Sequence, residues 1–193
     1  MPVMLHAQQA DTLYYGDGSI KAYGIVQHGK RQGLWQWLYP DGTRNATVHY
    51  QKGALNGWVK NYDFNGNLIG KEWYKAGLLQ DTAVYYHSNG QLRSKGRFEH
   101  NLYQGRWMFW NEAGVLVREG SYINGLPEGR WKFYHDDGQL WQEGSFAEGK
   151  EEGLWQYYRE DGKLEYTGSW KKGNRLEDWY YYTPKGKKKK MKQ

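Results

Sequence analysis

The chain has 193 residues and no cysteine, which excludes disulfides, thiolate catalysis and cysteine-based metal sites. Its 27 Lys and Arg residues include six lysines that follow Pro184, and the other 21 equal the 21 Asp and Glu residues in number, so the body of the chain is neutral. A neutral body argues against nucleic acid as a partner, because proteins that bind nucleic acid carry a basic stripe on the folded surface.

Residues 1–10 form an N-terminal extension that does not fit the pattern of the rest of the chain. Val3-Met4-Leu5 is an apolar stub, and the stretch from His6 to Ala10 has the small residues of a signal-peptide cleavage site. We therefore expect a signal-peptide remnant and a periplasmic or secreted protein. The alternative is an ordinary frayed N-terminus on a cytoplasmic protein.

Residues 11–184 follow a 24-residue repeat, in which one glycine marks a hairpin turn and another marks a second turn. The hairpin glycines are Gly18, Gly42, Gly66, Gly90, Gly114, Gly138, Gly162 and Gly186. The second-turn positions are Gly29, Gly53, Gly77, Asn101, Gly125, Gly149 and Gly173. Asn is the residue that best replaces glycine at positive φ, so the one exception keeps the turn. The fixed period predicts an array of hairpins without an internal domain boundary.

The block from Gly149 to Gly173 shows how one repeat is built. Leu154–Glu160 and Lys163–Trp170 are rich in β-favouring residues and predict two strands. Asp161-Gly162 lies between them and predicts a two-residue type I′ hairpin turn. Each repeat is therefore expected to contribute one hairpin to a sheet.

Cross-strand pairing sorts the side chains onto two faces of this sheet. The two-residue turn pairs Trp155 with Gly168, and the same register pairs Trp131 with Gly144. We expect each Trp ring to lie across the glycine that it faces and to shield that backbone. One face then collects the large rings, and the opposite face is polar apart from one aromatic column. The prediction is an all-β fold, an elongated and twisted antiparallel meander.

The repeat contains the motif G-x-x-x-G-x-W-x-x-Y-x-x-x-G-x-L. One block carries it as Gly149, Gly153, Trp155, Tyr158, Gly162 and Leu164, and the block before as Gly125, Gly129, Trp131, Tyr134, Gly138 and Leu140. Over roughly residues 15–186, the chain resembles the MORN-repeat-variant family, the YwqK-like bacterial proteins often labelled antitoxins. The resemblance implies a repetitive antiparallel sheet, an interaction role and no catalytic residues. The departures are Val59 and Asn61 in one block, and Asp81 and Ala83 in another.

The aromatic column on the polar face is the candidate binding surface. Its members are Tyr62, Tyr86, Trp110, Tyr134, Tyr158 and Tyr182. Tyr and Trp are favoured anchors at interfaces, whereas the alternative is that these rings only cover the sheet. No enzyme, cofactor or metal site is predicted, because the six histidines lack a metal-ligand spacing and acidic pairs such as Asp136-Asp137 fall in turns.

Three functions are compatible with these features. The first is a non-enzymatic scaffold for protein–protein interaction, which the family resemblance suggests could be antitoxin-like. The second is an extracytoplasmic repeat protein that binds glycan or cell-wall polymer through the aromatic column. The third is a membrane-peripheral scaffold, in which residues 185–193 form a basic, disordered tail that is attracted to anionic lipid.

Overall fold

In the computed structural model, residues 8–191 are described, and they form seventeen strands and no helix. The strands are β1 (Gln9–Tyr14), β2 (Ile20–Gln27), β3 (Lys30–Leu38), β4 (Arg44–Gln51), β5 (Ala54–Tyr62), β6 (Leu68–Lys75), β7 (Leu78–Tyr86), β8 (Leu92–Glu99), β9 (Leu102–Trp110), β10 (Leu116–Ile123), β11 (Leu126–Tyr134), β12 (Leu140–Ala147), β13 (Lys150–Tyr158), β14 (Leu164–Lys171), β15 (Asn174–Arg175), β16 (Tyr180–Tyr182) and β17 (Lys188–Lys190). The described chain divides into two compact units: residues 8–91 with 98–101, and residues 92–97 with 102–191. β8 contributes to both units, and each unit is described by itself.

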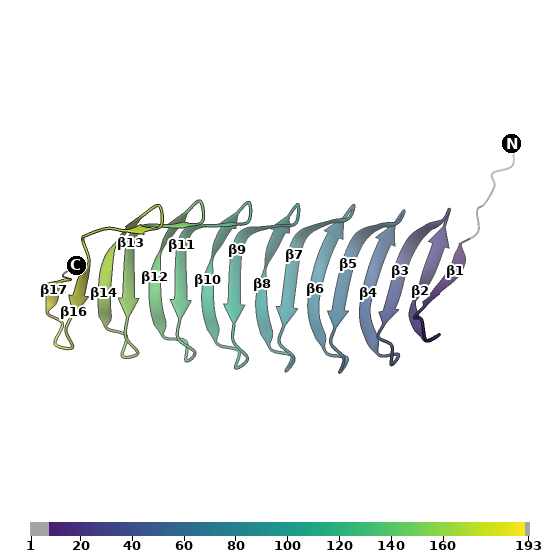
Figure 1. Cartoon of the computed structure of the whole chain (residues 1–193), viewed down its shortest axis with the longest axis horizontal. Coiled ribbons are helices and arrows are strands. Elements are labelled where there is room, and N and C mark those ends of the chain that lie inside the picture. Colours follow the sequence, from purple (N-terminus) through teal and green to yellow (C-terminus); the bar gives the residue numbers. More distant parts are fainter. Residues whose placement is uncertain (1–7, 192–193) are drawn as a thin grey trace. The chain divides into compact units, whose positions relative to one another are not determined.

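Within each unit, strands that follow one another in the sequence pair as antiparallel neighbours (Figure 1). In the first unit this pairing runs from β1 to β7. In the second unit it runs from β9 to β14, after which β16 pairs with both β14 and β17. The prediction of an all-β antiparallel meander of 24-residue hairpins is confirmed for each unit.

The end of the chain differs from the disordered tail expected from its sequence. Lys188–Lys190 form β17 and pair with β16. The Nζ atom of Lys188 lies 3.9 Å from the centroid of the Tyr180 ring, and that of Lys189 lies 5.9 Å from the centroid of the Tyr181 ring. Cation–π attraction between these lysines and the tyrosines of β16 therefore favours the pairing of β17 with β16. Residues 1–7 of the expected signal remnant and residues 192–193 lie outside the described part of the chain.

The hairpin turn has a different geometry from the predicted one. Arg159 N donates to Lys163 O at 2.9 Å, and Gly162 N donates to Arg159 O at 2.9 Å. Gly162 has φ +75°, whereas Asp161 has no positive φ. The prediction of a two-residue type I′ turn is therefore wrong, because that turn needs positive φ at both central residues. Asp161 instead accepts the backbone N–H of Lys163 at 3.1 Å, which favours a type I turn that ends in a left-handed glycine.

The register of the hairpin is nevertheless the predicted one. Tyr157 faces Tyr166 and Trp155 faces Gly168, as expected. Next to the turn, Tyr158 faces Leu164, so Glu165 is an extra residue in the return strand. This β-bulge restores the register that the longer turn would otherwise shift by one residue.

Each Trp ring lies over a glycine, but not over the one that was expected. A Cβ atom on Gly144 would stand 2.1 Å from Cδ2 of Trp155, so the ring of β13 covers the glycine of the preceding strand, β12. The Nε1 atom of Trp155 donates to Ser145 O at 3.2 Å beside that glycine. The same covering contact joins Gly24 to Trp35, Gly96 to Trp107, Gly120 to Trp131 and Gly168 to Trp179.

A wide irregularity between β12 and β13 explains this placement. Glu143 faces Gln156 and Ser145 faces Glu152, so three residues of β13 lie opposite one residue of β12. Gly153 begins the bulge with φ +71°, a value that side chains with a Cβ atom rarely adopt. The bulge brings the Trp155 ring back over β12, rather than over its partner in the hairpin.

The rings of the second unit form a continuous ladder on this face. Ring centroids are 5.9 Å apart for Trp131 and Phe133, 6.3 Å for Phe133 and Trp155, and 6.2 Å for Trp155 and Tyr157. Phe146 meets Trp155 edge to face, at 5.2 Å and 89°. Trp155 is only 2% exposed. Each repeat therefore buries its Trp only with the help of its neighbours, as expected for a repeat array.

Two repeats of the first unit lack the Trp, and each also lacks the glycine that the Trp would cover. Val48 faces Val59, and Glu72 faces Ala83. The two valines are buried and form a small core. Glu72 occupies the room that the small Ala83 leaves, and it accepts a hydrogen bond from the Tyr85 hydroxyl at 2.6 Å. In each pair, the larger residue at the glycine position compensates for the smaller residue at the Trp position, and the strand pairing is kept.

Adding a methyl group beneath a Trp ring should destabilise the protein. Gly144→Ala would place its Cβ atom 2.1 Å from the buried Trp155 ring, so we expect a loss of about 1–3 kcal/mol in urea-induced unfolding. The matched control is Gly16→Ala, where no atom lies within 4 Å of the added Cβ atom and the change should stay within about 0.5 kcal/mol. Equal losses in the two variants would contradict the covering contact.

Candidate functional site

The six aromatic residues predicted to form a binding column all occupy the last position of a strand. They are Tyr62 in β5, Tyr86 in β7, Trp110 in β9, Tyr134 in β11, Tyr158 in β13 and Tyr182 in β16, and each is half-buried. The first two belong to the first unit and the other four to the second. In the second unit, Trp110, Tyr134 and Tyr158 end alternate strands of one sheet, so they stand about 10 Å apart in a row.

Two of these tyrosines complete a cluster that recurs after 24 residues. Tyr134 donates its hydroxyl to Oε1 of Glu119 at 2.8 Å, and Oε2 of the same carboxylate accepts Arg106 Nη2 at 2.5 Å. Tyr158 likewise donates to Glu143 Oε1 at 3.1 Å, while Arg130 Nη2 donates to Glu143 Oε2 at 2.8 Å. We call these two clusters the Arg–Glu–Tyr triads.

The triads hold a nearly buried carboxylate beneath an exposed guanidinium. The side chains of Glu119 and Glu143 are 18% and 11% exposed, whereas those of Arg106 and Arg130 are each 67% exposed. The hydrogen bond from Arg106 lowers the pKa of Glu119, although burial of the carboxylate opposes this shift. Burial raises the pKa of Tyr134 to about 12, and the hydrogen bond to Glu119 adds to the rise. Tyr134 therefore stays a protonated donor, and Glu119 stays an acceptor, at neutral pH.

A shallow hollow lies between the two triads. It has a volume of about 160 Å³ and is lined by Arg106, Glu119, Gly120, Ser121, Arg130 and Lys132. Three of these side chains are cationic, and the one carboxylate among them is already bonded to Arg106. The hollow therefore presents excess positive charge next to the row of aromatic rings.

The sequence predicted the rings but not the charged members of the triads. Arg106 and Arg130 are 24 residues apart, as are Glu119 and Glu143, so the repeat contains the signal. To recognise a triad from the sequence, one must know how β10 pairs with both of its neighbours. Arg106 lies on β9, Glu119 on β10 and Tyr134 on β11. The predicted hairpin register gives only the first of these pairings.

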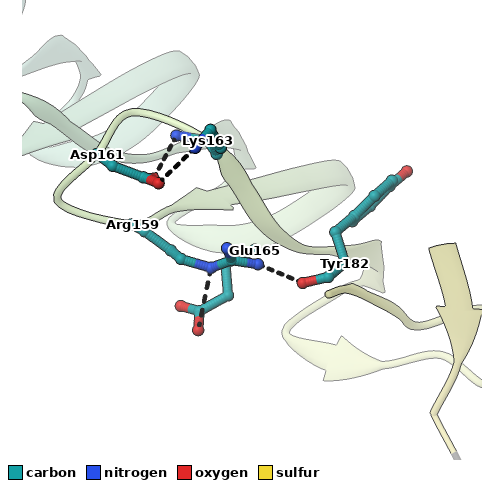
Figure 2. A network of polar contacts seen from close by, with 5 residues as sticks. All are labelled: Arg159, Asp161, Lys163, Glu165 and Tyr182. Atoms are coloured by element: carbon teal, nitrogen blue, oxygen red, sulfur yellow. Dashed lines mark hydrogen bonds and ion pairs between the residues drawn. The ribbon is translucent and has the colours of Figure 1, made fainter. Parts of the chain in front are cut away.

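The backbone beside other members of the column joins successive hairpins. Tyr39 donates its hydroxyl to the carbonyl of Tyr62 at 2.8 Å in the first unit. In the second unit, Figure 2 shows Arg159 donating to the carbonyl of Tyr182, with its Nε atom 3.8 Å from Glu165. In both cases the donor is the first residue of a hairpin turn and the acceptor lies 23 residues later. These ends of the column thus have a structural role in addition to any role in binding.

Residues 8–191 contain neither a metal-binding cluster nor a membrane-spanning helix. In this range, no group of three or more His, Asp or Glu side chains could hold a metal ion. The same residues include no helix with the length and apolar character needed to cross a membrane.

The stabilising effect of the Glu119 carboxylate should depend on pH. Because its pKa is lowered in the folded protein, its contribution is present above the ordinary pKa and is lost as the pH falls through the folded value. We expect Glu119→Gln to be less stable than the parent by about 1 kcal/mol at pH 7, with a gap that closes below about pH 4. Urea unfolding at both pH values measures this gap, and Glu160→Gln at an exposed turn position is the control. A gap independent of pH would contradict the assignment.

Several solved structures share a weak likeness with the chain. The GtfA/B complex bound to UDP and GlcNAc matches 72% of this chain and 24% of its own chain, with 12% identity and a TM-score of 0.24. TcdB2-TccC3 without its hypervariable C-terminal region matches 92% of this chain and 12% of its own, with 10% identity and a TM-score of 0.26. The Photorhabdus luminescens Tc holotoxin pore matches 91% and 13%, with 12% identity and a TM-score of 0.21. The chain thus spans less than a quarter of the length of these proteins. No match is found among the curated proteins.

The family model of the MORN repeat variant matches four consecutive stretches of the chain, at residues 82–100, 103–124, 127–148 and 151–172. The stretch 127–148 shows the correspondence, because it contains β11, the hairpin turn and β12. MORN repeats are non-catalytic and are consistent with a scaffold that takes part in binding. These four stretches, within residues 82–172, are therefore similar to the MORN repeat variant.

Proposed function

We propose that this chain is a non-enzymatic scaffold that binds a protein partner through the polar face of its second unit. The observation that carries the proposal is the alignment of Trp110, Tyr134 and Tyr158 beside the exposed guanidiniums of Arg106 and Arg130. Trp, Tyr and Arg are the residue types most enriched among the hot spots of protein interfaces. A face that repeats them every 24 residues offers anchors at regular intervals.

The rigidity of this face also supports the proposal. Tyr134 and Tyr158 are fixed by hydrogen bonds of 2.8 and 3.1 Å to carboxylates that are themselves bonded to arginines. Side chains that are ordered before binding lose less conformational entropy when a partner docks. On the opposite face, Trp107, Trp131 and Trp155 are buried.

Two narrower forms of the function follow from the same face. An antitoxin-like role would make the partner a toxin protein, which is the form that the family resemblance suggests. A glycan or cell-wall polymer is the second candidate, because the half-buried rings of Trp110, Tyr134 and Tyr158 could stack on sugar rings. A glycan array on the whole chain would distinguish this candidate from a protein partner.

Truncating the tryptophan of the row tests the proposal. We expect Trp110→Ala to weaken binding to a protein captured from cell extract by about 30-fold, the effect of losing a hot-spot side chain, without a change in the circular dichroism spectrum. The control is Phe64→Ala, which removes a ring that is 68% exposed in a turn of the first unit. The proposal fails if no protein is captured above background, if both variants lose binding equally, or if Trp110→Ala unfolds the chain.

A further inference from the structure

Five cationic side chains share the polar face of the second unit. They are Lys95 and Arg97 of β8, Arg106 of β9, and Arg130 and Lys132 of β11, and we call them the basic stripe. All are exposed except Lys132, which is half-buried. Their common face follows from Gly96, whose added Cβ atom would meet the Trp107 ring 2.1 Å away on the opposite face. Because side chains alternate along a strand, the neighbours of Gly96 point to the polar face.

The body of the chain is neutral overall, but most of its acidic residues lie in turns or next to them. There the carboxylates bind backbone N–H groups, as Asp137 does with Gln139 at 2.9 Å. Glu128 and Glu152 each accept an N–H group of the following second turn, at 2.9 and 2.8 Å. Positive charge is therefore separated from negative charge on the surface, which the overall composition does not reveal.

Two of the carboxylates on this face lie among the cations of the basic stripe, and both are bonded to its arginines. Glu119 and Glu143 belong to the Arg–Glu–Tyr triads, so their charges are compensated within the protein. The five cations of the stripe outnumber these two carboxylates, and Glu99 of β8 and Glu128 of β11 lie on the same face nearer the second turns. Farther along the unit, the same face of β13 and β14 carries the uncharged residues Gln156, Thr167 and Ser169, which are followed by Lys171 at the end of β14.

We propose that the basic stripe binds an acidic polypeptide segment, which specifies the chemistry of the partner in the function proposed above. The triads show the preference directly, because Arg106 and Arg130 each bind a carboxylate in the protein itself, at 2.5 and 2.8 Å. Each guanidinium is 67% exposed and has five N–H donors, so donors remain for a carboxylate from outside. Charge complementarity of this kind steers a partner and sets the register in which it docks.

The experiment uses the whole chain and a fluorescein-labelled peptide of ten Glu-Ser repeats, followed by fluorescence anisotropy. The parent should bind the peptide at low salt and more weakly as salt increases. The triple variant Lys95→Glu, Arg97→Glu, Lys132→Glu should bind about tenfold more weakly or worse, because like charges then oppose the peptide. The circular dichroism spectrum should stay close to that of the parent, whereas the thermal midpoint should fall, because Lys132→Glu places a second carboxylate opposite Glu119.

The matched control changes the net charge equally at a distance from the stripe. Lys150→Glu, Lys171→Glu, Lys172→Glu alters three exposed lysines near the second turns of the same unit, and its affinity should remain within about threefold of the parent. Equal losses in both triple variants would overturn the proposal, as would an absence of peptide binding to the parent. Tighter binding of a twenty-nucleotide oligothymidine than of the peptide would also overturn it, in favour of a phosphate polymer. If the peptide fails while Trp110→Ala still abolishes capture of a partner, the scaffold function stands and only the acidic partner is excluded.

Discussion

The contact between a Trp ring and the bare backbone of a glycine is the interaction on which the second unit depends. A single sheet has no second layer to cover it, so it must bury apolar surface with side chains large enough to lie along their own face. Trp155 does this by lying over Gly144, where even a methyl group would stand 2.1 Å from the ring. The two residues belong to successive hairpins, and the indole N–H bonds a carbonyl of the earlier one at 3.2 Å. The same contact that buries the ring therefore joins one repeat to the next.

The first unit shows how strict this constraint is. The Trp position and the glycine position change together, to Val59 with Val48 and to Ala83 with Glu72. A ring without a bare backbone would clash, and a bare backbone without a ring would be left exposed, so neither residue can change alone at low cost. The match to the family begins at residue 82, and each later stretch retains both members of the pair.

The 24-residue period and the side-chain alternation were sufficient to predict the strands, their pairing and the two faces. The turn type was not predictable, because Asp-Gly suits both a two-residue turn and the longer turn with a left-handed glycine, and the bulge at Glu165 hides the difference in register. The ring positions depend on the bulge at Gly153, which sets three residues against one. The charged members of the site were missed because each triad spans three strands, whereas the hairpin pattern relates only two.

On the polar face, too, residues at two positions change together from repeat to repeat, but here the change concerns charge and not side-chain volume. In the repeat after the triads, Leu154 takes the position of Arg130, and Thr167 takes that of Glu143. Thr167 is 8% exposed and donates its hydroxyl to Trp155 O at 3.1 Å, so its buried polar group is hydrogen-bonded and needs no cation beside it. A carboxylate at so buried a position would lose solvation without a guanidinium to compensate it. Arg and Glu must therefore appear or disappear together, and a regular backbone can change its surface charge from one repeat to the next without disturbing the core.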